Sequence, residues 1–288
     1  MQQNSTSSIN QIANIFFNPS NRDDDSSISH LLQTINLTPL NKEIKSSNIV
    51  ILISGFLSEN ENHDSEWENL TFSLDNSHTI YFYNWPGETL PNAIGNSLLK
   101  VATILPNVMK GIDQTINSLI SSKPSDVFVK ASKKAALSGK LLGIMLASKL
   151  FFPHQSITLI GFSLGVHVIK NCLKEMYKIH QETELNCLDI IEDVIRIAGA
   201  TSVSKKVQKY KEIFNTILSR NIFQCYSKTD NVLKVLYRTA MFKEPVGVSQ
   251  LKLDGLEKIK NCDFTSLELG HLDYRKKMDL VMSKIALL

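Results

Sequence analysis

The stretch Ser156-Ile-Thr-Leu-Ile-Gly-Phe-Ser-Leu-Gly165 decides the fold of this 288-residue chain. Its first half, Ser156 to Ile160, is short, β-branched and apolar, which is typical of a parallel strand covered on both faces. Its second half follows the pattern Gly-x-Ser-x-Gly, in which a serine lies on a sharp turn between a strand and a helix. The flanking glycines leave room for the close backbone approach that such a turn imposes. The stretch therefore predicts a nucleophile elbow with Ser163 at its tip.

The residues after Gly165 change to a helical spacing. The segment to about His180 is therefore predicted to be an amphipathic helix. Its N-terminus would point at Ser163, with unpaired N–H groups and the positive end of the helix dipole. Those groups would stabilise negative charge on a reacting carbonyl oxygen. The apolar positions are Val166, Ile169, Leu173 and Met176, and Lys170, Lys174 and Lys178 lie on another face.

A nucleophilic serine needs a base, and in this type of fold the chain order is serine, then acid, then histidine. Of the seven histidines, only His271 lies beyond every plausible acid downstream of Ser163. It follows a strand-like run, Cys262 to Leu269, and precedes a final helical pattern. His271 is therefore the predicted base. The other six histidines are His30, His63, His78, His154, His167 and His180.

The acid is expected just after a strand, at the carboxyl edge of the sheet. The predicted strand Val194 to Ala198 is followed by residues 199–203, which contain no carboxylate, and Glu192 and Asp193 precede that strand. The next predicted strand, Ile222 to Tyr226, is followed by Asp230, which is the predicted acid. Asp254 and Asp263 remain alternatives, whereas Asp273 is too close in sequence to His271 to orient it easily.

An oxyanion hole would take one N–H from the residue after the nucleophile, Leu164, and a second from the loop after an earlier strand. Ser47 to Ile53 is that predicted strand, and Ser54-Gly55-Phe56 follows it. Many hydrolases of this type have His-Gly at that point, so Ser54-Gly55 is a departure. The backbone donor is retained, and Phe56 is the predicted second donor.

These features together resemble the α/β-hydrolase superfamily over about residues 47–288. The predicted fold class is α/β, with a mostly parallel sheet covered by helices on both faces and a helical insertion before the nucleophile strand. Residues 1–45 are predicted to be a flexible or late-docking arm. Residues 46–288 are predicted to form an α/β-hydrolase domain, with a helical cap or covering insertion at 93–155.

Four blocks narrow the resemblance to the hydrolase domain of the transmembrane-and-coiled-coil-domain-four family, and the last two are the most specific. The resemblance implies that Ser163, Asp230 and His271 form the triad. Members of that family commonly carry membrane-spanning or long helical extensions, and this chain is short of those. The blocks are Gly161-Phe-Ser-Leu-Gly165, Ile197-Ala-Gly-Ala200, Tyr226-Ser-Lys-Thr-Asp-Asn-Val-Leu233 with Leu236-Tyr-Arg238, and Gly270-His-Leu-Asp-Tyr-Arg275.

The helical pattern at residues 93–120 and 131–152 has two interpretations. The segment could form a lid or a membrane-contacting hairpin over the site, so 93–152 is a candidate for peripheral membrane contact. It could also supply the helices that cover the sheet, which is the favoured interpretation. A full transmembrane span is not expected, because Lys140 and Lys149 leave only residues 141–148 free of charge, and a span needs about 20 residues. The spacing of Gly139 and Gly143 indicates close helix packing.

Composition limits the other functions. With 43% hydrophobic and 20% charged residues the chain can bury one large core, and a net charge of +3 gives no reason to expect nucleic acid binding. The four cysteines show no C-x-x-C pairing, so buried free thiols are expected. No cofactor is predicted, and His63, Asp64 and Glu66 lack metal-ligand spacing. No Sec signal is recognisable, so a cytoplasmic location, with a membrane surface as an option, is expected.

The predicted reaction is hydrolysis of a carboxylic ester through an acyl-enzyme. The flanking Phe162 and Leu164 and the apolar middle segment favour a hydrophobic acyl ester, so a lipid esterase or lipase is the first prediction. Two alternatives remain: a catalytically silent scaffold or membrane-trafficking interaction module, and a membrane-damaging lipase effector. Trp85 could line an acyl pocket or belong to the core. His167, one turn beyond Ser163, is expected to pack or face solvent.

Overall fold

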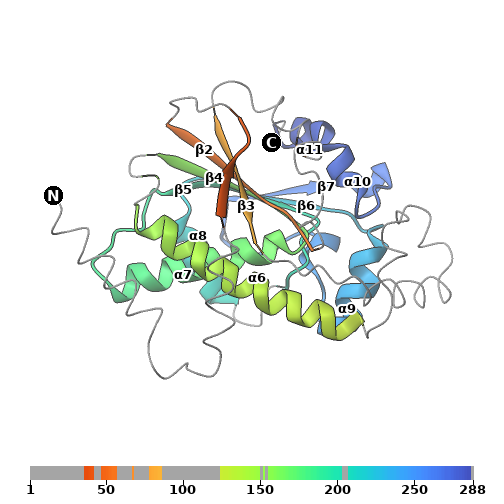
Figure 1. Ribbon diagram of the computed structural model, residues 1–288. Helices are drawn as coiled ribbons and strands as arrows, with labels where there is room; N and C mark the ends of the chain where they lie inside the picture. Colours follow the sequence, from red (N-terminus) through yellow and green to blue (C-terminus); the bar gives the residue numbers. More distant parts are fainter. Residues whose placement is uncertain are drawn as a thin grey trace.

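A seven-stranded sheet forms the centre of the molecule (Figure 1). The computed structural model describes residues 36–41, 47–56, 67, 78–85, 124–149, 152, 155–202 and 207–286. The strand order is β1-β3-β2-β4-β5-β6-β7. The strands are β1 (Asn36–Pro39), β2 (Asn48–Ile53), β3 (Thr79–Asn84), β4 (Ser156–Phe162), β5 (Ile191–Ile197), β6 (Ile222–Tyr226) and β7 (Ile259–Asp263).

All neighbouring strands are parallel except β1, which pairs antiparallel with β3 at one edge. The described part of the sheet therefore begins at Asn36, ten residues before the expected domain start at 46, because Asn36 pairs with Asn84. Asn41 ties this edge down, since its Nδ2 donates to the His78 carbonyl at 2.8 Å. The preceding residues 1–35 of the expected arm lie outside the described residues.

Helices cover both faces of the sheet, as predicted: α6, α7 and α8 lie on one face, and α10 and α11 on the other (Figure 1). The helices are α6 (Pro124–Ala147), α7 (Gly165–Glu182), α8 (Val207–Ile217), α9 (Arg238–Met241), α10 (Asp273–Lys276) and α11 (Met278–Ala286). A π-helical turn (Leu233–Tyr237) leads into α9, and two 3₁₀ turns (Val246–Val248, Thr265–Leu267) join the later elements.

The apolar runs of β2 and β4 supply the middle of the core. Every residue of β2 from Ile49 to Ile53 is at most 2% exposed. A strand with helices on both faces has no solvent side, which explains why its sequence is continuously apolar instead of alternating. The mostly parallel sheet that these runs predict is therefore confirmed.

Two predicted strand boundaries were wrong. The run Cys262–Leu269 is not one strand, because β7 ends at Asp263 and Thr265–Leu267 forms a 3₁₀ turn. The Asp263 carboxylate accepts the Thr265 N–H at 2.8 Å and so closes that turn. β5 begins at Ile191 and not at Val194, so that Glu192 and Asp193 lie inside the strand, where both pair with Arg220.

Helix α6 precedes the nucleophile strand and packs closely against α7. A Cβ atom on Gly139 would lie 2.3 Å from the Val168 carbonyl oxygen, and one on Gly143 would lie 2.6 Å from the Cys172 carbonyl oxygen. The two glycines therefore mark a close helix contact, as their spacing predicted. No helix among the described residues is long and apolar enough to cross a bilayer. Residues 93–123 of the predicted insertion lie outside the described residues.

Candidate active site

Ser163 lies on the sharp turn between β4 and α7. Its φ angle is 53°, in the left-handed region that serine rarely adopts, which indicates backbone strain held by the surrounding structure. Its N–H donates to the Ile197 carbonyl at 3.0 Å, and its own carbonyl accepts the Ala200 N–H at 2.9 Å. These two hydrogen bonds therefore hold the turn against the end of β5.

The two glycines of the motif are required by packing. A Cβ atom on Gly165 would lie 2.1 Å from the Ile53 carbonyl oxygen, so α7 starts directly against the end of β2. A Cβ atom on Gly161 would lie 2.7 Å from Ile169 Cδ1 and 2.9 Å from the Gly165 carbonyl carbon. All three distances are shorter than real Cβ atoms essentially ever show, which explains the Gly-x-Ser-x-Gly pattern in this chain.

Ser163, His271 and Asp230 form one chain of hydrogen bonds. Ser163 Oγ lies 2.9 Å from His271 Nε2, and His271 Nδ1 lies 2.7 Å from Asp230 Oδ2. The exposed fractions are 6% for Ser163, 8% for His271 and 0% for Asp230. With a proton on Nδ1, the ring donates to the carboxylate and accepts from the serine hydroxyl. The structure thus brings together the three residues that were selected from chain order.

Secondary contacts hold the acid and the imidazole. Asp230 Oδ1 accepts the Leu233 N–H at 3.0 Å, which leaves Oδ2 for the histidine. The His271 ring lies against Phe162, with 5.0 Å between ring centroids. The guanidinium carbon of Arg275 also lies over the Phe162 ring, 5.9 Å from its centroid. The Phe162 ring therefore contacts both the His271 imidazole and Arg275 beside the serine turn.

The alternative acids are used elsewhere. Asp263 accepts the Tyr226 hydroxyl at 3.0 Å, and hydrogen bonds and Lys228 lower the pKa of this carboxyl despite the opposing effect of burial. Asp273 Oδ2 accepts the Gly270 N–H at 2.8 Å and orders the turn before His271. Asp254 lies exposed in a turn. Among the described carboxylates considered from the sequence, Asp230 alone reaches His271.

The two predicted oxyanion donors flank the serine. Leu164 follows it directly and precedes the first residue of α7, so its N–H belongs to the helix N-terminus. A Cβ atom on Gly55 would lie 2.8 Å from Ser163 Cβ, so the loop after β2 passes against the nucleophile. Phe56 is the next residue of that loop, and its ring packs edge to face on Phe128 at 6.0 Å.

Both tryptophans of the chain donate to Ser54 in the same loop. Trp85 Nε1 donates to the Ser54 carbonyl at 3.0 Å, and Trp67 Nε1 donates to Ser54 Oγ at 3.3 Å. The side chains are 5% and 1% exposed. Sequence reasoning missed this role: Trp85 and Trp67 belong to the core, and both hold Ser54, the residue at which this chain departs from His-Gly.

His167 is not part of the hydrogen-bonded chain. Its Nδ1 lies 2.8 Å from Thr201 Oγ1, and burial, followed by Lys170 and Lys174, lowers its pKa to about 3. The imidazole is therefore neutral at physiological pH and packs, as expected. Within the described part of the chain, no group of three His, Cys, Asp or Glu side chains could hold a metal ion. His63, Asp64 and Glu66 lie outside that part.

The sheet order, the strained serine turn and the covering helices define the α/β-hydrolase fold. The chain belongs to the family described as Protein of unknown function (DUF726), whose model matches residues 21–288. The resemblance inferred from the four sequence blocks agrees with this membership, since one family relative is named for transmembrane and coiled-coil domains.

The curated relatives of this chain are distant in sequence and longer. The chain is 28% identical over 278 residues to "Probable lipase MIL1" of Saccharomyces cerevisiae, covering 89% of this chain and 24% of that protein. It is 26% identical over 253 residues to "Transmembrane and coiled-coil domain-containing protein STS1" of Oryza sativa, covering 82% and 36%. An uncharacterized membrane protein of Caenorhabditis elegans is 28% identical over 255 residues, covering 82% and 39%. The chain thus spans well under half of these relatives.

Solved structures with a similar fold include an α/β serine hydrolase without a lid from Xanthomonas campestris. It is 12% identical, covers 87% of this chain and 85% of its own, and has a TM-score of 0.37. A predicted CIB-like hydrolase from Thermoplasma acidophilum is also 12% identical, covers 88% and 98%, and has a TM-score of 0.39.

Proposed function

We propose that this chain is a serine hydrolase that cleaves a carboxylic ester with a hydrophobic acyl group. The observation that carries the proposal is the buried chain of hydrogen bonds from Ser163 through His271 to Asp230. A relative named as a probable lipase supports an ester of the lipid class. The buried, apolar side chains of Phe162 and Leu164 beside the serine support an apolar acyl group.

In the proposed reaction, Ser163 attacks the ester carbonyl while His271 takes the hydroxyl proton at Nε2. Asp230 holds the ring in the tautomer with the proton on Nδ1 and stabilises the imidazolium that forms. The N–H groups of Leu164 and Phe56 receive the oxyanion. His271 then returns the proton to the leaving alcohol and activates a water, which releases the acid from Ser163.

The test is labelling of the purified chain with a fluorophosphonate probe. We expect labelling of the wild type and loss of labelling in Ser163→Ala and in His271→Ala, with no loss in Ser266→Ala, which changes an exposed serine. Hydrolysis of p-nitrophenyl esters of increasing acyl length then tests the substrate class, and we expect longer acyl chains to react faster. A folded wild type that is neither labelled nor active would contradict the proposal and favour a scaffold with a silent site.

We also propose that the chain works at a membrane surface, because several relatives are named as membrane proteins. Flotation with lipid vesicles tests this proposal. Binding to vesicles would support a membrane-adsorbed hydrolase, while a chain that stays entirely in the unbound fraction with neutral and anionic vesicles alike would argue against surface contact by this part of the protein.

A further inference from the structure

Phe242, which follows the last residue of α9, lies almost entirely in solvent. It is 92% exposed. The other exposed large apolar residues in the part of the chain that the structure describes are 38–42% exposed, and they are Val207, Leu267 and Leu280. Single apolar residues are common on protein surfaces, so exposure alone does not indicate a function. The backbone of Phe242 supplies a second observation.

The backbone of Phe242 is in the left-handed region, with φ 51° and ψ 36°. Its N–H donates to the Arg238 carbonyl at 2.9 Å and so closes the end of α9. Glycine or asparagine commonly occupies such a position, because a bulky side chain is strained there. The helix end therefore does not require phenylalanine, and the exposed ring gains no packing that would offset the strain. Strain of this kind is typical of functional positions.

The segment after Phe242 is held at the edge of the sheet that carries the nucleophile. The Val246 N–H donates to the Thr201 carbonyl at 2.7 Å, and Thr201 lies just beyond the end of β5. In the same stretch, the Ala200 N–H donates to the Ser163 carbonyl at 2.9 Å. Phe242 and Ser163 therefore belong to the same edge of the sheet.

Two ring contacts connect α9 with the proposed oxyanion loop. Tyr237, directly before α9, packs edge to face on Phe128 of α6, with 5.8 Å between ring centroids. Phe128 packs in the same way on Phe56 at 6.0 Å. A row of aromatic rings thus runs from the loop beside Ser163 to the helix that presents Phe242.

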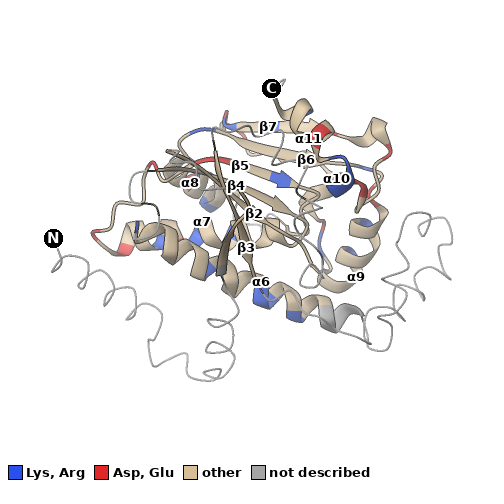
Figure 2. Cartoon of the chain, turned by 45° about the horizontal axis from the view of Figure 1, so that its top comes forward, with Lys and Arg blue, Asp and Glu red and all other residues tan. Residues whose placement is uncertain are grey.

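The charges around Phe242 are positive on balance. Arg238 pairs with Glu244, with 2.6 Å from Nε to Oε2, so these two charges offset each other. Lys243, the next residue after Phe242, is exposed. Helix α6 packs against α9, and its residues 128–147 include four lysines and no acid (Figure 2).

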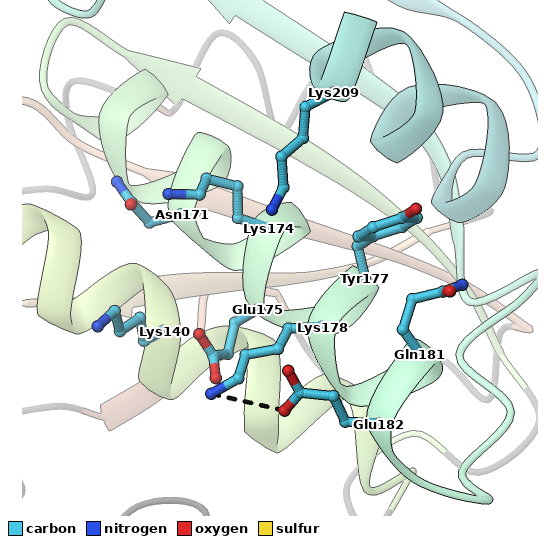
Figure 3. A pocket seen from close by; sticks show the side chains of 9 residues that line it. All are labelled: Lys140, Asn171, Lys174, Glu175, Tyr177, Lys178, Gln181, Glu182 and Lys209. Atoms are coloured by element: carbon cyan, nitrogen blue, oxygen red, sulfur yellow. Dashed lines mark ion pairs between the residues drawn. The ribbon is translucent and has the colours of Figure 1, made fainter. Parts of the chain in front are cut away.

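A groove on the outer side of α7 extends the positive charge on the face of the sheet that α6 covers. It has a volume of about 380 Å³ and is lined by four lysines, from α6, α7 and α8, and by two glutamates (Figure 3). Glu182 pairs there with Lys178 at 3.8 Å. An excess of lysine attracts anions in general, so the groove adds to the attraction of an anionic surface without selecting one ligand.

A bilayer surface fits one exposed ring among charged groups. At the boundary between head groups and acyl chains, the ring leaves water while lysines stay at the level of anionic head groups. A protein partner would cover a contiguous apolar patch, whereas Arg238, Lys243 and Glu244 beside the ring are exposed and charged.

We propose that Phe242 inserts into a bilayer that contains anionic lipid, and that this contact brings the sheet edge with Ser163 to the membrane. The inference rests on the membrane-surface contact proposed above and assigns that contact to one residue.

The first measurement is tryptophan fluorescence of Phe242→Trp in the whole chain, with the wild type as the blank. Trp67 and Trp85 are 1% and 5% exposed, so the introduced indole is the one that responds to lipid. The vesicles contain phosphatidylcholine alone or phosphatidylcholine mixed with phosphatidylserine. We expect the mixed vesicles to shift the emission to shorter wavelength. Bromine atoms on the acyl chains should quench it, because they reach only an inserted indole.

The second measurement is flotation of Phe242→Asn with the same vesicles. Affinity for the mixed vesicles should fall about tenfold or more, since burial of the ring is lost. Without lipid, this variant should unfold at the same or a higher temperature than the wild type, because asparagine tolerates the left-handed backbone. Leu280→Gln is the matched control: it changes an exposed apolar residue of α11, on the opposite face of the sheet, and should bind as the wild type does.

An indole that is not quenched, or equal vesicle affinity of Phe242→Asn and the wild type, would overturn the inference even if the wild type binds membranes. A wild type that binds no vesicle would overturn it together with the proposed surface contact. Sedimentation without lipid tests the other occupant: a dimer that dissociates in Phe242→Asn would show that the ring covers a second copy of the chain. Quenching that is equal with both vesicle types supports insertion and removes anionic lipid from the proposal.

Failure of the hydrolase proposal is recognised separately. Ser163→Ala should bind vesicles as the wild type does. Phe242→Asn and the wild type should hydrolyse a dissolved p-nitrophenyl ester at the same rate, because Phe242 acts on membrane contact and not on the reaction. A chain that inserts the indole but hydrolyses no ester would therefore support this inference while contradicting the proposed chemistry at Ser163.

Discussion

Asp230 is the residue on which the proposed chemistry depends most sharply. Its side chain is fully buried, and its two oxygens are used by different partners: Oδ2 by His271 and Oδ1 by the Leu233 N–H. An amide in the same place can keep the second contact, but it favours the wrong histidine tautomer. Under the proposed mechanism, position 230 therefore requires a carboxylate, and an amide of the same shape is not sufficient.

We predict that Asp230→Asn lowers kcat on a p-nitrophenyl ester by about ten thousandfold while the chain stays folded. Steady-state kinetics and circular dichroism measure the two effects. The control is Asp254→Asn, which changes an exposed aspartate that the sequence also left open. A loss of less than about tenfold in Asp230→Asn would remove this residue from the proposed mechanism.

At the scale of elements, α6 and α7 pack so closely that glycine is required at the contact. Gly143 faces the Cys172 carbonyl so closely that a Cβ atom would lie 2.6 Å from it. Backbone atoms on a helix cannot yield as a flexible side chain can, so an added methyl group must separate the helices.

We predict that Gly143→Ala lowers the free energy of unfolding by about 1 to 3 kcal/mol, as overpacking does. Helix propensity works in the opposite direction, since alanine is favoured over glycine by about 1 kcal/mol in a helix interior. Urea unfolding decides which effect is larger, with Lys133→Ala, at an exposed position on the same helix, as control. A more stable Gly143→Ala would mean that α6 and α7 are less tightly packed than described.

Helix α7 also carries a group whose charge disfavours folding. The pKa of Lys170 falls from its ordinary 10.5 to about 8, first because of burial and then because of Arg196, Lys174 and Lys243. Since the folded pKa is the lower one, the unfolded chain binds more protons between about pH 8 and 10.5. The contribution of Lys170 to stability therefore rises with pH across that window.

We predict that Lys170→Met has a larger free energy of unfolding than the wild type at pH 7. This difference should shrink as the pH rises through 8 toward 10.5. Comparing variant with wild type cancels the other titrating groups. Urea unfolding at several pH values measures the difference, and a variant whose advantage grows above pH 8 would contradict the sign. Loss of the hydrogen bond from Lys170 to the Ser202 carbonyl shifts the difference equally at each pH below the window.

At the scale of the whole molecule, the reactivity of the four cysteines depends on how well the core is closed to solvent. Cys172, Cys187, Cys225 and Cys262 are all free and buried, as the absence of C-x-x-C pairing predicted. Burial raises the pKa of the Cys187 thiol to about 11 and raises that of Cys172 further. Burial also raises the pKa of Cys225, whereas the hydrogen bond with the Cys225 thiol lowers the pKa of Cys262, whose side chain is only 1% exposed. All four thiols should therefore react slowly near neutral pH, because a thiolate must form and the reagent must reach it.

We predict that a disulfide reagent such as DTNB labels none of these thiols rapidly in the native chain and all four after unfolding in urea. Time-resolved absorbance gives the number of thiols labelled in the native chain and the number labelled after unfolding. The native rate should follow the opening of the core, so the logarithm of the rate should increase in Gly143→Ala in proportion to the stability that this variant loses. One rapidly reacting thiol in the native wild type would show that part of the sheet or α7 is more accessible than described.

The sequence by itself determined the central parallel strands and the composition of the candidate site. Buried parallel strands are continuous apolar runs, and the elbow is a local pattern, so β2, β4 and the Ser163 turn could be read from neighbouring residues. Chain order selected Asp230 and His271, because the carboxyl ends of parallel strands meet at one edge. The tertiary structure then set the hydrogen-bond distances among Ser163, His271 and Asp230.

Only the tertiary structure decided the contacts between residues distant in sequence. The pairing of β1 with β3, the hydrogen bonds of the two tryptophans to Ser54, and the burial of Arg196 beside Lys170 join segments that no local pattern links. Arg196 occupies an otherwise ordinary strand position, and its burial depends on where α7 and α8 pack. Local sequence sets backbone preference and polarity, but the solvation of a charge depends on what the rest of the chain places around it.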